Sequence, residues 1–308
     1  MELRQLEILR ELGALGSVTA VAESLRVTPS AVSQQLSALQ REYRAPLTQR
    51  RGRTLALTNA GLALTRAGVD VIDAMAAAKH AVEVFEEAPT GAVTLSGFHS
   101  AAQALFGPLI TELRSHDASP TISLADEDVA QEAFPTLTAH YDLVLAHRLA
   151  HSAPWPADGL RVIPLIQEPL DVALPLGHPL AAHTSLSPQD VVDERWVTSR
   201  AGFSPDDLIR AISTITDRSI DVVHRVNDYG SVASVIASGD AIGMVPRYTV
   251  GSTHTGLVLR PLTGITATRN IDVLTRPENL HRRSVQTVIV ALRAALARLV
   301  DASGDTQR

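Results

Sequence analysis

Residues 16–61 read GSVTAVAESLRVTPSAVSQQLSALQREYRAPLTQRRGRTLALTNAG, and this segment decides the fold of the N-terminal domain. Apolar residues recur at helical spacing over 18–25 and again over 32–39, and a residue that can cap a helix precedes each run. Upstream, leucines at every third position from 3 to 15 predict a further helix. The sequence therefore predicts three short helices that pack on one core.

The third predicted helix carries a polar outer face opposite its apolar stripe, made of Ser30, Ser33, Gln34, Ser37 and Arg41. Glutamine can form two hydrogen bonds to adenine, and serine can bond base edges or phosphates. Two helices joined by a short turn are typical of the helix-turn-helix, whose second helix enters the major groove. The alternative interpretation is a polar face that contacts only solvent.

A basic turn follows these helices. Arg50, Arg51 and Arg53 surround Gly52 and precede residues 54–58, in which apolar and polar residues alternate. This pattern predicts a β-hairpin wing, and arginines at its tip could contact phosphates or the minor groove. Taken alone, the arginine cluster is also compatible with a solvated loop.

Segment 16–61 resembles the winged helix-turn-helix of LysR-type transcriptional regulators. The resemblance lies in the Ala-rich second helix, SAVSQQL at 30–36, the proline before the wing and LTNAG at 57–61. Family members commonly have Phe after the Pro-Leu pair, whereas Thr48 follows here, so this departure concerns the packing beneath the wing. Together, the helix face and the resemblance predict these DNA contacts: Thr28, Pro29, Ser30, Ser33, Gln34, Ser37, Arg50, Arg51 and Arg53.

The DNA-binding domain is expected to span residues 1–58, and a linker is expected at 59–88. The linker is rich in alanine and free of proline from Asn59 to about Glu87, which predicts one long helix there. Apolar residues at alternating spacings of three and four predict a seam for a second copy. The predicted seam consists of Leu64, Ala67, Val71, Ala74, Ala78, Ala81 and Phe85. Packing on its own chain is the alternative, while the resemblance implies a homodimer or homotetramer that addresses two half-sites.

Residues 89–308 alternate between expected strands and helices, which indicates an α/β domain with a largely parallel sheet. The expected elements are strands at 92–97, 121–124, 142–146, 196–199, 222–226, 243–245 and 271–275, apolar runs at 162–166 and 170–175, and helices at 101–114, 129–139, 205–214, 231–238 and 284–299. YDLVLA at 141–146, QEPLDVALPLGHPLA at 167–181 and VASVIASGDAIGMVPR at 232–247 resemble the effector domain of the same family. That resemblance implies a two-lobed fold similar to periplasmic solute-binding proteins, with lobe I at about 89–163 and 267–308 and lobe II at about 164–266.

Effector contacts are expected where strands end at the cleft between the lobes. The candidates are Phe98, His99, Ser100, Thr198, Ser199, Arg200 and Tyr229. Backbone N–H groups at 98–100 could hold an anion, and Arg200 could pair with a carboxylate, so a carboxylate is one candidate effector. Ordinary capping and turn chemistry is the alternative explanation for these residues.

Composition limits the remaining classes of function. The 308 residues include no cysteine, which excludes disulfides, thiolate metal sites and thiol redox sensing. The first residues lack the pattern of a signal peptide and no stretch is apolar enough to span a bilayer, so we expect a protein of the cytoplasm without membrane contact. The formal net charge is −6, but residues 1–60 contain eight Arg against five Glu, a net of +3. The basic charge therefore lies where DNA contacts are predicted.

The sequence thus predicts a regulator that binds double-stranded promoter DNA and responds to a small-molecule effector. Neither a metal nor a cofactor is expected, because the histidines lack metal-ligand spacing and no phosphate-binding or nucleophile motif is present. A small-molecule binding protein without a DNA-binding role is the alternative. An enzyme is a third hypothesis, which the missing nucleophile-base pair disfavours.

Overall fold

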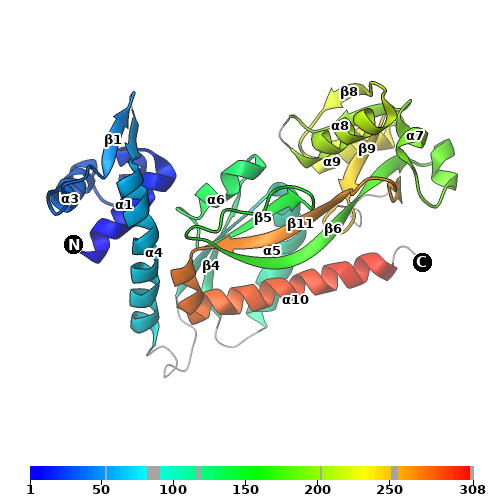
Figure 1. The fold of residues 1–308 in the computed structure, drawn as a ribbon. Coiled ribbons are helices and arrows are strands. Elements are labelled where there is room, and N and C mark those ends of the chain that lie inside the picture. The colour runs from blue at the N-terminus through cyan, green and yellow to red at the C-terminus, as the bar shows by residue number, and fades with distance from the viewer. Residues whose placement is uncertain (53, 82–90, 116–118, 202, 251–255, 306–308) are drawn as a thin grey trace.

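The computed structural model describes residues 1–308 except 53, 82–90, 116–118, 202, 251–255 and 306–308. Figure 1 shows a small N-terminal domain on the left, a long helix below it, and two α/β lobes in the centre and at the upper right. Two neighbouring strands run from one lobe into the other. None of the helices among the described residues combines the length and apolar character needed to cross a membrane.

The N-terminal domain has the three helices and the hairpin that the sequence predicts. Its elements are α1 (Leu3–Leu15), α2 (Val18–Ser24), α3 (Pro29–Arg41), β1 (Thr48–Arg51) and β2 (Thr54–Leu57). Arg26 has a φ of 53°, which turns the chain between α2 and α3. Leu9, Val32 and Leu39 are among the buried residues of the core, and Leu47 and Leu57 close it beneath the wing.

The LTNAG sequence forms the junction between the wing and the linker helix α4 (Asn59–His80). The Thr58 hydroxyl accepts a hydrogen bond from the Gly61 N–H at 3.1 Å and donates to the Pro46 carbonyl at 2.5 Å. A Cβ at Gly61 would lie 2.1 Å from the Leu47 carbonyl oxygen. The LTNAG motif therefore requires Thr58 to cap α4 and Gly61 to let the hairpin lie close to α4.

The linker helix α4 packs one face on α1. Gly68 lies against Leu6, and Ile72 is buried. The expected helix extends to about Glu87, and its final part falls at 82–90, outside the described residues.

Lobe I consists of three strands and part of two longer ones, covered by helices. Its own elements are β3 (Ala92–Gly97), α5 (His99–Arg114), β4 (Thr121–Asp126), η2 (Gln131–Ala133), α6 (Phe134–Leu137), β5 (Leu143–Leu149), η4 (Pro277–His281) and α10 (Arg283–Asp305). Apolar side chains of α5 and α10 pack on the sheet in one core. The helix expected at 129–139 is wrong in extent, because Pro135 has no N–H to continue a helical ladder from residue 131.

Lobe II has a smaller sheet with a core on each face. Its elements are η3 (Pro179–Ala182), α7 (Pro188–Val191), β7 (Arg195–Thr198), α8 (Ser204–Thr216), β8 (Asp221–Arg225), α9 (Tyr229–Ala237), β9 (Ile242–Pro246) and β10 (Leu257–Arg260). Leu208 and Ile212 of α8 belong to one core, and Val232 and Ile236 of α9 belong to the other.

The two lobes share one nine-stranded sheet through β6 (Arg161–Pro175) and β11 (Thr268–Thr275). The apolar runs at 162–166 and 170–175 form this single strand β6, which pairs with β11 through Pro169 and with β9 from Leu170 onward. The expectation of a largely parallel sheet is corrected here, because four of the eight pairings are antiparallel. Each lobe keeps parallel outer strands, whereas the crossing strands run antiparallel to their neighbours.

Polar side-chain contacts hold the N-terminal domain against lobe I. Glu11 of α1 is inaccessible to solvent and accepts hydrogen bonds from both terminal nitrogens of Arg276, which precedes η4. Arg10 pairs with Glu278 at 2.8 Å, and Asp73 of α4 contacts His281 at 2.8 Å. These contacts connect the helix that supports α3 with the domain that contains the cleft.

Candidate functional site

Helix α3 begins and packs as its sequence requires. The Thr28 hydroxyl caps it by accepting from the Ala31 N–H at 3.2 Å, and Pro29 occupies the first turn. Val32 and Leu39 are fully buried, which turns the opposite face of the helix outward. The helix is thus fixed by its cap and its apolar stripe, while its polar side chains stay accessible.

The six side chains of this region that the sequence assigns to DNA are all exposed: Thr28, Pro29, Ser30, Ser33, Gln34 and Ser37. The Ser33 hydroxyl donates to the Pro29 carbonyl within the helix. Within the described part of the chain, the side chains of Ser30, Gln34 and Ser37 have no hydrogen-bond partner. These three side chains are therefore free to bond another molecule.

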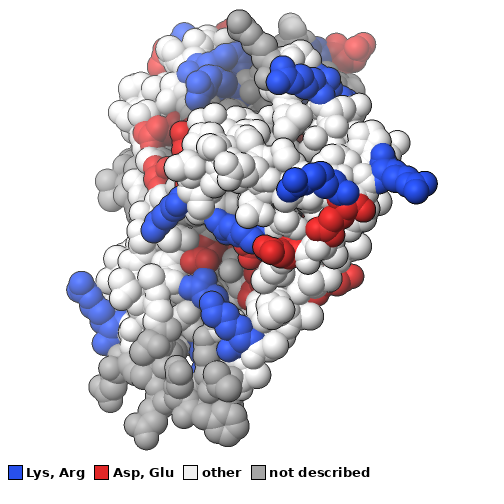
Figure 2. All heavy atoms as spheres, turned by 90° about the vertical axis from the view of Figure 1, so that its left-hand side faces the viewer, with Lys and Arg blue, Asp and Glu red and all other residues white. Residues whose placement is uncertain are grey.

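The wing presents basic side chains beside α3. Arg50 and Arg51 of β1 are exposed and have no acidic partner among the described residues, whereas Arg53 lies outside them. Figure 2 views the molecule from the side of this domain and shows basic side chains spread over this face, with acidic side chains between some of them. The exposed Arg50 and Arg51, which have no acidic partner among the described residues, suit contact with a polyanion.

The linker helix leaves most of its predicted seam exposed. Ala67, Val71, Ala74, Ala78 and Ala81 are exposed, whereas Leu64 is partly buried against the core of the N-terminal domain. Leu62 and Met75 are exposed on α4 as well, with 42% and 52% of their surface accessible. Phe85 lies outside the described residues. The free side of α4 is therefore mainly apolar, and its inner side is already used by α1.

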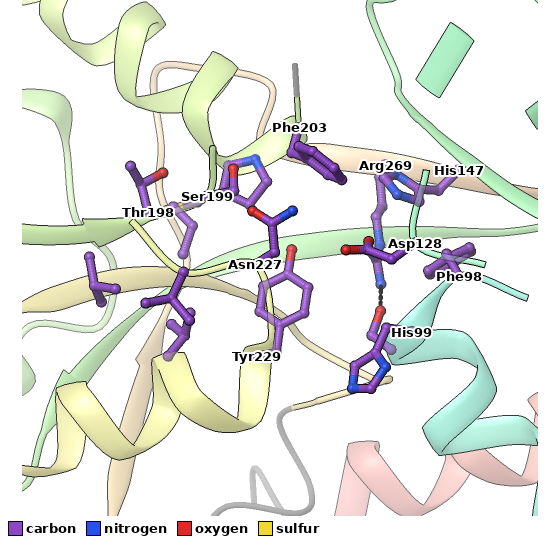
Figure 3. A pocket seen from close by; sticks show the side chains of 16 residues that line it. Phe98, His99, Asp128, His147, Thr198, Ser199, Phe203, Asn227, Tyr229 and Arg269 are labelled. Carbon is purple, nitrogen blue, oxygen red and sulfur yellow. Dashed lines mark hydrogen bonds between the residues drawn. The ribbon is translucent and has the colours of Figure 1, made fainter. Parts of the chain in front are cut away.

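A small cavity of about 40 Å³ lies between the two lobes. Figure 3 shows Thr198, Ser199 and Asn227 from lobe II facing His147, Phe98 and Arg269. The lining is as follows: Phe98, His99, Ser100, Asp128, His147, Val197, Thr198, Ser199, Phe203, Pro205, Val226, Asn227, Tyr229, Val232, Met244 and Arg269. The cavity thus lies at the ends of β3 and β7 and at the first turns of α5 and α9.

Six of the seven residues predicted for the effector line this cavity: Phe98, His99, Ser100, Thr198, Ser199 and Tyr229. The seventh, Arg200, is exposed, and its guanidinium lies 5.8 Å from the centre of the Phe203 ring, outside the lining. The Arg200 backbone N–H donates to Asn227 Oδ1 at 3.0 Å. Arg200 therefore contributes to the cavity by orienting Asn227.

Sequence reasoning missed Arg269, His147, Asn227, Asp128 and Phe203. Arg269 and His147 lie within strands β11 and β5, so no loop or strand end marks them. The one available signal was the charge of Arg269 just before the expected strand at 271–275, because an arginine entering a buried strand requires a partner.

Arg269 is the largest charged side chain buried in the cleft, and only 1% of it is accessible to solvent. Its Nε donates to Glu168 Oε2 at 2.9 Å, and Nη2 donates to Ser100 at 3.0 Å and Thr249 at 2.8 Å. The Phe98 ring lies 4.9 Å from the guanidinium carbon. The charge of Arg269 is thus compensated before any ligand enters.

His99 bridges the lobes at the edge of the cavity. Its Nδ1 lies 2.8 Å from Asp126 in lobe I, and its Nε2 lies 3.0 Å from Asp228 in lobe II. The hydrogen bond to Asp126, opposed by partial burial and reinforced by the charges of both carboxylates, raises the pKa of His99 above 6.5. The bridge requires a protonated ring, because both nitrogens must donate.

The inner aromatic groups are kept neutral. Burial, followed by the charge of Arg269, lowers the pKa of His147 well below 6.5. Burial is also the main reason that the pKa of Tyr229 is raised to about 12. At neutral pH the cavity therefore offers an uncharged imidazole and an uncharged phenol. No group of His, Cys, Asp and Glu within the described ranges is arranged to hold a metal ion.

An exposed recognition helix, a basic wing and a two-lobed domain with an internal cleft define a DNA-binding regulator of the winged helix-turn-helix class. Residues 3–62 match the family described as "Bacterial regulatory helix-turn-helix protein, lysR family", and residues 86–297 match "LysR substrate binding domain". The chain belongs to the LysR family of transcriptional regulators.

Relatives along most of the chain are also regulators. A probable RuBisCO transcriptional regulator of Cyanophora paradoxa is 23% identical over 290 residues, which cover 92% of this chain and 89% of the relative. The HTH-type transcriptional regulator MetR of Haemophilus influenzae is 22% identical and covers 80% of this chain and 78% of its own.

Solved structures share the fold over nearly the whole length. A full-length OxyR from Pseudomonas aeruginosa, carrying a cysteine-to-aspartate change, matches with a TM-score of 0.68, 16% identity and 95% coverage of both chains. CbnR in complex with its target DNA matches with a TM-score of 0.53 and 17% identity, covering 96% of this chain and all of that one.

Proposed function

We propose that this regulator recognises promoter DNA through Gln34 and the small polar residues of α3, while the wing arginines contact phosphates. The observation that carries this proposal is the exposed polar face of α3 beside exposed arginines. Among the described residues, Ser30, Gln34 and Ser37 have no hydrogen-bond partner, and Arg50 and Arg51 have no acidic partner. Phosphate contacts then position the domain and the Gln34 amide reads a base edge. A protein in contact with promoter DNA acts in the cytoplasm, and no catalytic role is proposed.

A second copy is proposed to pack on the free side of α4, through Ala67, Val71, Ala74 and Ala78. Small side chains allow close approach of two helices, and the exposed Met75 beside them is covered in a dimer. Dimerisation places two copies of α3 on two half-sites, with a spacing fixed by the symmetry of the dimer. A tetramer made of two such dimers would keep the same contacts between α4 helices within each dimer.

The cleft is proposed as the effector site. Its lining joins both lobes, so a ligand there binds one lobe arrangement more tightly than another and shifts their populations. The contacts of Glu11 and Asp73 with lobe I connect that lobe directly to α1 and α4. Effector binding would thus alter the half-site geometry or the bending of DNA.

The experiment compares binding to the promoter beside the chain's own gene at several salt concentrations. Gln34→Ala is expected to lose about 1–3 kcal/mol of discrimination between the operator and a mutated operator. Arg51→Ala is expected to weaken binding to both and to reduce the salt slope by about 1. Arg114→Ala removes an exposed arginine of α5 and serves as the matched control.

Wild-type binding by both Gln34→Ala and Arg51→Ala would show that another face docks. A complete lack of promoter binding would favour the alternative of a small-molecule binding protein without a DNA-binding role. The exposed, uncompensated arginines of the wing argue against that alternative, because a scavenging protein has no use for them.

A further inference from the structure

Three buried polar atoms in the cleft lack a hydrogen-bond partner in the part of the chain that the structure describes: Thr198 Oγ1, Asn227 Nδ2 and His147 Nδ1. All three residues line the same cavity, with Thr198 and Asn227 on lobe II and His147 on lobe I. Thr198 is only 2% exposed. Leaving such atoms unpaired is costly, so the cleft is built to bond a polar molecule.

The orientation of Asn227 specifies what that molecule must offer. Asn227 Oδ1 accepts the backbone N–H of Arg200, so the amide nitrogen is the end that is directed away from it. With the amide turned over, two donors would face each other. The ligand therefore needs an acceptor for Asn227 Nδ2, while Thr198 can either donate or accept.

The cations in the lining are already paired with carboxylates. Arg269 contacts Glu168, and His99 contacts Asp126 and Asp228. Asp228 also caps α9 by accepting from the Ser231 N–H at 2.8 Å, which offsets the positive end of that helix. A carboxylate ligand would thus find no free counter-charge in the described lining.

The one further charge in the lining is negative. Asp128 is exposed at the edge of the cavity and lies near enough to Tyr229 to contribute to its raised pKa. His147 stays neutral next to Arg269. The polar groups that remain for a ligand are the amide of Asn227, the hydroxyls of Thr198 and Tyr229 and the uncharged imidazole of His147. An anion would be repelled by Asp128.

The size of the cavity limits the ligand as strongly as its charge does. A water needs roughly 10–15 Å³ of such space, so the cavity of about 40 Å³ accommodates roughly three water-sized groups in this arrangement of the lobes. Phe98, Phe203 and Tyr229 supply the aromatic part of the lining. A molecule of about four non-hydrogen atoms is therefore at the upper limit of what this arrangement of the lobes admits.

We propose that the cleft binds a small uncharged amide-like molecule, which accepts a hydrogen bond from Asn227 and bonds the Thr198 hydroxyl and His147. This inference rests on the proposed role of the cleft as the effector site. It replaces the carboxylate expected from Arg200, whose guanidinium lies outside the cavity lining.

The test uses three molecules of one shape and different charge: acetamide, acetate and acetamidinium. Each is titrated into the full-length protein at constant ionic strength, and the midpoint of thermal unfolding is measured. Acetamide is expected to raise the midpoint in proportion to its binding, whereas acetate and acetamidinium should match sodium chloride. Stabilisation by acetate or acetamidinium equal to that by acetamide would overturn the proposal, as would no stabilisation by acetamide.

Substitutions locate the effect. Thr198→Val keeps the shape of the side chain and removes the hydroxyl, so the acetamide concentration for half-maximal stabilisation should rise about tenfold. Thr121→Val, an exposed site on β4, is the matched control and should leave that concentration unchanged. An unchanged acetamide response in Thr198→Val would place the binding elsewhere and reject the assignment. Promoter binding is measured on the same preparations. Wild-type protein that binds the promoter but does not respond to acetamide would reject only the proposed ligand class. Wild-type protein that does not bind the promoter would reject the proposed function.

Discussion

Arginine side chains have opposite environments in two regions of the molecule. One region is the surface formed by α3 and the wing, and the other is the cleft between the lobes. Arg50 and Arg51 are exposed without acidic partners among the described residues, whereas Arg269 is buried and bound to Glu168. The free state of the protein tolerates the first arrangement because water solvates the guanidinium groups. It tolerates the second only because a carboxylate compensates the desolvated charge.

The difference indicates which kind of ligand each site is prepared for. An uncompensated, solvated cation gains its counter-charge from phosphate when DNA binds and releases counterions. A compensated cation fixes the shape of a site and leaves neutral hydrogen-bonding groups to choose the ligand. Substitutions that break the buried Arg269–Glu168 pair should therefore affect folding, and those of the wing arginines should affect only DNA binding.

The largest effect is expected from breaking the buried pair. Glu168 is inaccessible to solvent, and its Oε1 also accepts from the N–H groups of Tyr248 and Thr249 at 2.8 and 2.6 Å. Glu168→Gln leaves Arg269 charged without compensation and should lower the free energy of unfolding by about 3–5 kcal/mol. Chemical denaturation measures this loss, with the exposed Glu132→Gln as control, expected within about 0.5 kcal/mol.

The double substitution Glu168→Gln with Arg269→Met should recover much of that loss, because no buried charge remains and the Gln oxygen still accepts from the N–H groups of Tyr248 and Thr249. If Glu168→Gln alone unfolds like the wild type, Arg269 is solvated in the free protein and the contrast between the two sites fails.

An intermediate effect is expected from the His99 bridge, and it depends on pH. Because the pKa of His99 is raised in the folded state, its stabilisation is complete below the ordinary value of 6.5 and is lost as the pH rises through the folded-state pKa. His99 is partly exposed, so the contribution should stay below about 1 kcal/mol. Unfolding free energies of the wild type and His99→Gln, measured from pH 6 upward, should converge as the pH rises; a difference that is constant with pH would contradict the bridge.

The smallest effect on stability is expected on the wing. Arg50→Ala removes an exposed charge at a strand end and should change the free energy of unfolding by less than about 0.5 kcal/mol. Denaturation of this variant alongside Glu168→Gln tests the comparison directly. A loss above that range would mean that Arg50 supports the hairpin in the free protein.

Local patterns predicted the N-terminal domain well. Thr28 and Pro29 mark the start of α3, and Thr58 and Gly61 mark the junction with α4, because caps and close approaches depend on neighbouring residues. Patterns also placed most strands of the lobes. They failed for β6, which the sequence divided into two apolar runs at 162–166 and 170–175, although one strand continues through both lobes between its partners.

The sequence by itself determined the helices, the wing, the exposed polar face of α3 and the strand ends that line the cleft. Those features follow from the spacing of apolar residues and from capping, which act over a few residues. The tertiary structure alone decided that Arg269 and His147 join the cleft, that Arg200 does not, and that Glu168 neutralises Arg269. These pairings join residues about a hundred positions apart, and the energy of a buried charge depends on which partner the fold brings to it.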